Sequence, residues 1–128
     1  MKKQIIFLII ATLFMFSCSK SKEKKIIGSW EQQYFVKYDD DRLTVWTFAD
    51  DQTVTEDFFY GSNIDTTIVG TYTINVNLGT CYLTVEGFGL DDGKYQILKL
   101  NKKFLIMQRV EFNGSINGAF SRKEFVKK

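Results

Sequence analysis

The stretch Thr67-Ile68-Val69-Gly70-Thr71-Tyr72-Thr73-Ile74-Asn75 decides the fold. Side chains in a β-strand alternate between its two faces, and here the residues suited to a core fall at every second position. We expect Ile68, Gly70, Tyr72 and Ile74 on one face and Val69, Thr71 and Thr73 on the other. β-Branched and aromatic residues, which favour strands, fill most of the positions. The stretch therefore predicts a half-buried β-strand.

The same pattern continues on both sides of this strand and predicts eight strands. Turn residues interrupt it at short intervals, and Asn113-Gly114 is a strong signal for a type I′ hairpin. The predicted strands are Gly28–Tyr38, Arg42–Ala49, Thr53–Tyr60, Thr67–Asn75, Thr80–Glu86, Lys94–Leu100, Lys103–Phe112 and Ile116–Val126. No segment has the period of a long helix.

The short connections determine how these strands pair. A parallel crossover needs a dozen or more residues, so successive strands must be antiparallel neighbours. Eight strands in simple succession form a meander, and closure into a barrel removes the two unpaired edges that an open sheet would expose. We therefore predict a single all-β domain, an up-and-down meander in a closed or nearly closed barrel. A two-sheet sandwich is the alternative.

The N-terminus has the organisation of a secretory signal. Lys2 and Lys3 precede an apolar run of about a dozen residues, and a membrane-spanning helix needs ~20. Met15-Phe16-Ser17-Cys18 resembles a lipobox, which implies that residues 1–17 are cleaved and that Cys18 becomes an acylated N-terminus. The alternative is an ordinary secretory signal with a chance cysteine. Residues 18–26 are polar and lysine-rich, so we expect a disordered tether before a domain over residues 27–128.

Composition limits the function. Removal of the first 17 of the 128 residues leaves 111, with 15 basic and 15 acidic side chains, which argues against a nucleic-acid partner. The absence of histidine excludes Ser-His-Asp triads and histidine-bearing zinc sites. No Gly-rich phosphate loop is present, and we expect neither a metal nor a cofactor. Cys81, the remaining cysteine, is expected to be a core residue. An enzyme based on two carboxylates is possible in principle, but no such constellation is apparent, and we expect a non-enzymatic protein.

Five short motifs together resemble a known family. They are Gly28-Ser29-Trp30, Trp46-Thr47-Phe48-Ala49-Asp50-Asp51-Gln52-Thr53, Gly70-Thr71-Tyr72-Thr73-Ile74, Tyr95-Gln96-Ile97-Leu98-Lys99-Leu100 and Leu105-Ile106-Met107. In this order they resemble the compact lipocalin-like domains of small bacterial lipoproteins, over about Ile26 to Phe125. The resemblance implies that Gly28 and Trp30 are structural and that Trp30 closes one barrel end. It also implies that an arginine of the last strand, for which Arg122 is the candidate, lies over that ring.

Two sets of residues are candidates for binding. A cavity inside the barrel would be lined by Trp46, Phe48, Tyr72, Leu83, Tyr95, Ile97 and Met107, with the two tyrosines as polar groups. A filled interior is at least as compatible with so many rings. At the end opposite the N-terminus, an acidic rim is predicted from Asp39, Asp40, Asp41, Asp65, Asp91 and Asp92, with Glu111 nearby. The rim could attract a cationic ligand, a basic protein or Ca²⁺, although aspartates also simply form turns.

These observations lead to two functional hypotheses for a monomeric domain held by lipid on Cys18 in the cell envelope. The first is binding of a small hydrophobic or amphipathic molecule in the barrel mouth. The second is a protein-interaction module with a filled barrel, either an envelope accessory subunit or an inhibitor of a secreted enzyme. Ser19 after the cysteine, where a retention signal would have aspartate, favours the outer membrane.

Overall fold

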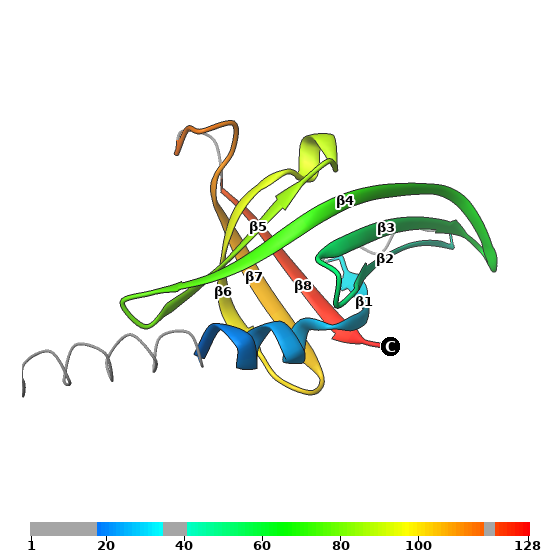
Figure 1. The fold of residues 1–128 in the computed structure, drawn as a ribbon. Helices are drawn as coiled ribbons and strands as arrows, with labels where there is room; N and C mark the ends of the chain where they lie inside the picture. Colours follow the sequence, from blue (N-terminus) through cyan, green and yellow to red (C-terminus); the bar gives the residue numbers. More distant parts are fainter. Residues whose placement is uncertain (1–17, 35–40, 117–119) are drawn as a thin grey trace, which may run out of the picture.

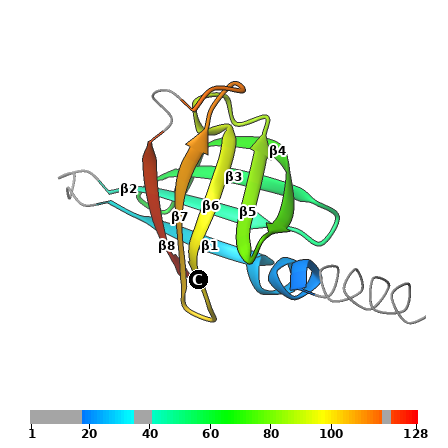
Figure 2. The same ribbon diagram turned by 90° about the vertical axis from the view of Figure 1, so that its left-hand side faces the viewer.

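The fold is an eight-stranded barrel. The structure is a computed structural model that describes residues 18–34, 41–116 and 120–128. Its strands pair antiparallel in chain order, and the last pairs with the first, so the sheet is closed (Figures 1 and 2). The strands are β1 (Gly28–Gln33), β2 (Arg42–Phe48), β3 (Thr53–Tyr60), β4 (Asn63–Asn77), β5 (Thr80–Glu86), β6 (Gly93–Leu100), β7 (Phe104–Glu111) and β8 (Ser121–Lys127). The predicted meander barrel is confirmed, and closure rules out the sandwich.

The alternation in β4 is as predicted. Gly70, Tyr72 and Ile74 are buried on the inner face, whereas Val69 on the outer face is 63% exposed. A Cβ atom at Gly70 would lie 2.3 Å from the carbonyl oxygen of Glu86 on β5. Glycine is therefore required at this position, because only its lack of a side chain allows the close approach of the chain that leaves β5.

Strand ends differ most from the prediction where no face is buried. β3 and β5 have the predicted bounds, but β4 begins at Asn63 rather than Thr67. Residues 63–67 are exposed on both faces in the hairpin with β3, so they carry no burial period that the sequence could reveal. β8 begins at Ser121 rather than Ile116. β1 ends at Gln33, whereas the predicted first strand ended at Tyr38, of which residues 35–38 lie outside the described residues.

The predicted turn at Asn113-Gly114 forms, but it closes a very short hairpin. Both residues have positive φ, at 51° and 73°, as a type I′ turn requires. Phe112 and Ser115 exchange both backbone hydrogen bonds, at 2.9 and 3.0 Å. The β7–β8 register then resumes only at Arg109 opposite Ser121. The connection is consequently longer than a two-residue turn.

Residues 18–26 form a helix, where the sequence analysis predicted a disordered tether. The helix lies across one barrel end, which we call the base (Figures 1 and 2). The Ser19 hydroxyl donates to the carbonyl oxygen of Ile74, at 3.1 Å, and Ile26 is fully buried. Lysine and glutamate have good helix propensity, and Ile26 supplies the apolar contact with the barrel. A single apolar residue at the end of a polar segment gives no helical period in the sequence. No described helix is long and apolar enough to cross a bilayer.

Trp30 closes the base, but its cationic neighbour is not Arg122. Trp30 is fully buried and donates from Nε1 to the carbonyl oxygen of Ile26, at 2.6 Å. Lys127 is its register partner on β8; the lysine Nζ lies 4.3 Å from the ring centroid and donates to the carbonyl oxygen of Ile27. Arg122 is on the outer face, where Nε contacts a Glu124 carboxylate oxygen at 2.8 Å. The prediction for Arg122 was wrong because residues 122 and 127 face opposite sides of β8.

The backbone conformation at Gly28 favours glycine. Its φ is +115°, a value that other residues rarely adopt, and a Cβ atom would lie 2.7 Å from the Lys127 Nζ. Because the lysine ammonium is the end of a flexible side chain, the positive φ is the stronger reason for glycine here.

Candidate functional site at the mouth of the barrel

The end opposite the base, which we call the mouth, is covered by the β5–β6 loop. This loop contains the 3₁₀ turn η1 (Gly89–Asp91) and folds inward over the core. Phe88 is buried, and its ring meets the Trp46 ring edge-on with centroids 5.0 Å apart. The loop therefore acts as a plug over part of the mouth.

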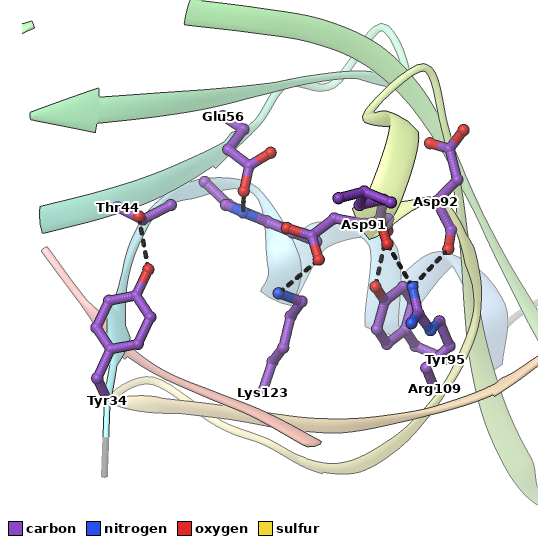
Figure 3. Close-up of polar contacts among 10 residues, drawn as sticks. Tyr34, Thr44, Glu56, Asp91, Asp92, Tyr95, Arg109 and Lys123 are labelled. Atoms are coloured by element: carbon purple, nitrogen blue, oxygen red, sulfur yellow. Dashed lines mark hydrogen bonds and ion pairs between the residues drawn. The ribbon is translucent and has the colours of Figure 1, made fainter. Parts of the chain in front are cut away.

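Backbone atoms of the plug accept or donate several hydrogen bonds. The Tyr95 hydroxyl donates to the carbonyl oxygen of Asp91 at 2.7 Å, and Arg109 Nη1 donates to the carbonyl oxygens of Leu90 and Asp92 at 2.6 and 3.2 Å (Figure 3). The Phe88 amide donates to the Asp92 carboxylate at 2.6 Å. Burial raises the pKa of the Tyr95 phenol, which stays a donor at physiological pH. The bonds from Tyr95 and Arg109 fix the plug to β6 and β7, and the bond between Phe88 and Asp92 stabilises the loop itself.

Two buried charged residues, Glu56 and Lys123, lie beneath the plug beside Asp91, a partly exposed residue of the plug itself. The Lys123 ammonium contacts the Asp91 carboxylate at 2.8 Å and lies 5.4 Å from the Trp46 ring centroid. Glu56, paired with Trp46 in the β2–β3 register, is 1% exposed and accepts a 2.9 Å hydrogen bond from the indole Nε1 (Figure 3). We call Glu56, Asp91 and Lys123 the interior charge cluster; its two carboxyl groups share one lysine.

The surroundings of Glu56 favour its protonated form. Burial raises the pKa of the Glu56 carboxyl to about 7; the bond from Trp46 and the charge of Lys123 oppose this shift, and the nearby Asp91 carboxylate adds to it. A neutral Glu56 leaves one carboxylate and one ammonium beneath the plug, which is the balanced state. Ionisation of Glu56 would leave one uncompensated negative charge there.

The seven predicted ligand-lining residues are packed together in the barrel interior. Six of them, Trp46, Phe48, Tyr72, Leu83, Tyr95 and Met107, belong to the buried core cluster, and Ile97 packs against it partly buried. The Phe48 and Tyr72 rings meet edge-on at 5.0 Å. The Tyr72 hydroxyl donates to the carbonyl oxygen of Ala49 at 2.6 Å, so the protein itself satisfies this polar group. This arrangement corresponds to the filled-interior alternative.

A cavity lies instead at the outer end of β2 and β3. Its volume is about 510 Å³. Thr44 and Phe58 stand opposite each other in its wall, and the Tyr34 hydroxyl is 2.7 Å from the Thr44 hydroxyl (Figure 3). The lining residues are Tyr34, Arg42, Leu43, Thr44, Phe58, Phe59, Tyr60 and Asp65. We call this space the mouth cavity.

The mouth cavity was not predicted, although the sequence contains a signal for it. Phe58-Phe59-Tyr60 is an aromatic run that ends a strand, so at least one ring had to lie on an exposed face. Tyr60 is 63% exposed. Tyr34 reaches the cavity because it directly follows β1, whose Glu31 lies opposite Val45 of β2.

The predicted acidic rim has mixed outcomes. Asp39 and Asp40 lie outside the described residues. Asp91 and Asp92 are used within the plug, the first in the partly buried ion pair with Lys123 and the second on the Phe88 amide. Asp41 and Asp65 are exposed, and Asp65 lines the mouth cavity. Turn formation, the alternative interpretation, accounts for Asp92.

The sequence and the fold were compared with known proteins. No protein-family model matches the chain, and neither the curated proteins nor the solved structures contain a significant match.

Proposed function

We propose that this protein is a lipid-anchored, lipocalin-like envelope lipoprotein that binds a small amphipathic molecule in the mouth cavity. The observation that carries the proposal is the cavity itself. Its volume of about 510 Å³ is within the ~300–1,000 Å³ typical of small-molecule sites. Rings of Tyr34 and Phe58 offer apolar walls, while Arg42 and Asp65 offer charged groups at an open edge. Apolar walls with few polar groups suit a ligand that has both characters.

The anchor is proposed from the lipobox-like sequence before Cys18. Cys18 is exposed in the described helix, so an attached diacylglyceryl group would meet no steric obstacle there. Cys81, the other cysteine, is buried, and burial raises the pKa of its thiol. The proposal includes the outer membrane as the location. It includes no catalytic role.

The anchor can be tested by mass. We expect the chain extracted from bacterial membranes to lack residues 1–17 and to carry covalent lipid at Cys18, whereas the Cys18→Ser variant should carry none. Recovery of unmodified wild-type chain from the soluble fraction would contradict the anchor.

The binding site can be tested with two fluorescent amphiphiles, a dansyl-labelled fatty acid and the corresponding fatty amine. Phe58→Asp places a charge in the wall of the mouth cavity. We expect it to lower the affinity for whichever probe the wild type binds more tightly by at least ~10-fold. Phe104→Asp is the matched control, because Phe104 is a partly exposed phenylalanine near the base. Equal affinity in both variants, or no binding of either probe to the wild type, would contradict the site.

A protein-interaction module is the second candidate function. Large apolar side chains are exposed around the mouth, namely Tyr60, Ile64, Leu90, Ile116 and Phe120. Exposed apolar groups near one another are common in protein-binding surfaces. On this alternative the apolar residues around the mouth, rather than the cavity, would contact the partner.

A further inference from the structure

The base of the barrel brings lysines together from segments far apart in the sequence. Lys127 links them, because its ammonium donates to the carbonyl oxygen of Ile27, just after the helix, and its amide donates to the carbonyl oxygen of Lys103 in the β6–β7 turn. The exposed cations of these segments are Lys20, Lys24, Lys25, Lys99, Lys102, Lys103 and Lys128. The exposed aspartates of the neighbouring β2–β3 turn are Asp50 and Asp51. The base is therefore strongly basic, although the chain after residue 17 is balanced in charge.

A leucine projects from the same end in an unfavourable backbone conformation. Leu78 forms the tip of the β4–β5 turn with φ +49°, is followed by Gly79 with φ +80°, and is 89% exposed. Asparagine or glycine adopts this conformation at lower cost, and a turn has no structural need for a large apolar side chain. Such an outlier suggests a function for the side chain.

Leu78 also lies near the proposed site of lipid attachment. A cleft of about 260 Å³ between the N-terminal helix and the β4–β5 turn is lined by both Cys18 and Gly79, the residue after Leu78. The Ser19 hydroxyl bond to Ile74 holds this part of the helix against β4. An acyl group on Cys18 would therefore enter the membrane beside the turn.

We propose that the base is a membrane-contact surface that takes anionic phospholipid headgroups, with Leu78 entering the interface beside the acylated Cys18. This inference rests on the proposed lipid anchor, which brings the base close to the bilayer. Each lysine near an anionic surface contributes about 1 kcal/mol, which raises the binding constant for that surface about fivefold. A single apolar side chain in the interface adds to this attraction. The contact orients the mouth cavity away from the membrane.

Tryptophan reporters at the two ends of the barrel test the inference. Leu78 and Leu90 are matched, since they are 89% and 85% exposed and lie at the base and in the plug. The full lipidated chain, as Leu78→Trp or Leu90→Trp, is placed in vesicles of brominated phosphatidylcholine with or without about one quarter phosphatidylglycerol. Trp30 and Trp46 are fully buried, and the wild-type signal corrects for them.

We expect bromine to quench Leu78→Trp more strongly than Leu90→Trp, and more strongly in the anionic vesicles. Adding Lys102→Gln and Lys103→Gln should lower the ratio of docked to undocked protein roughly 30-fold in those vesicles. Equal quenching of both reporters, or stronger quenching of Leu90→Trp, would overturn the inference. Failure of the anchor is recognised separately, because the intact mass of the same sample shows whether Cys18 carries lipid.

Discussion

At the residue scale, Glu56 is the side chain whose environment differs most from its ordinary one. It is a buried acid that accepts the Trp46 indole proton and neighbours the Asp91–Lys123 pair. A buried carboxyl is easier to accommodate when neutral, and the plug above it is fixed by the remaining charges. The sequence marks the position only as an inward-facing residue of a strand, and this is an unusual place for glutamate.

Glu56→Gln should change how stability depends on pH. The folded pKa of about 7 lies above the ordinary 4.5, so the folded state holds the proton more tightly. The contribution of Glu56 is then fully present below pH 4.5 and is lost as pH rises through 7, at a cost of about 3 kcal/mol. The glutamine can still accept from Trp46, so the variant should lose this decline. Urea unfolding of both proteins across this range measures the difference; parallel profiles would contradict the assignment.

Lys127 and Arg122 provide a second residue-scale prediction. Lys127→Met removes both the contact with the Trp30 ring and the hydrogen bond to Ile27, and we expect a loss of about 1–2 kcal/mol in the free energy of unfolding. Arg122→Met, the control, removes a surface ion pair and should change it by less than ~0.5 kcal/mol. A larger loss of stability from Arg122→Met than from Lys127→Met would instead support Arg122 as the residue over the Trp30 ring, as the family resemblance implies.

At the scale of elements, the strands were predictable where one face is buried and the other is not. Cys81, Leu83 and Val85 show this in β5, since each is buried on the inner face. The start of β4 and the N-terminal helix were not predictable, because residues 18–25 and 63–67 are mostly polar and reveal no period. Of the candidate site, the rings that fill the interior could be identified, but not the mouth cavity. The cavity depends on the side chain of Tyr34, which follows β1 and contacts Thr44 on the neighbouring strand β2.

Asp91→Asn should loosen the plug. The variant leaves Lys123 buried without its carboxylate partner, and we expect a loss of about 2 kcal/mol, discounted because the Asp91 side chain is 29% exposed. Amide hydrogens of the loop, that of Phe88 among them, should exchange faster in the variant than in the wild type, whereas exchange in β5 should stay the same. Asp65→Asn at an exposed site is the control. Unchanged exchange in the loop of Asp91→Asn would show that the ion pair does not hold the plug.

Leu78→Asn should stabilise the fold. Asparagine tolerates the left-handed conformation of this turn better than leucine does, and we expect a gain of about 1 kcal/mol in urea unfolding. Leu90→Asn, equally exposed but outside the left-handed region, should give no such gain. A loss of stability in Leu78→Asn would mean that the leucine has a structural role in the turn.

At the scale of the whole molecule, the two ends of the barrel differ in chemistry. The base carries Cys18, exposed lysines and Leu78, whereas the mouth carries the plug and an aromatic cavity. The filled interior separates the two ends. We propose that this barrel is held at its base by lipid and carries a small amphipathic molecule at its mouth.

The most direct test of that claim is a native mass spectrum of the full chain, extracted gently from bacterial membranes, compared with its denatured spectrum. We predict covalent lipid in both spectra and, in the native spectrum alone, a reproducible excess mass that disappears on denaturation. A lipidated chain with the same mass in both spectra would contradict the binding claim.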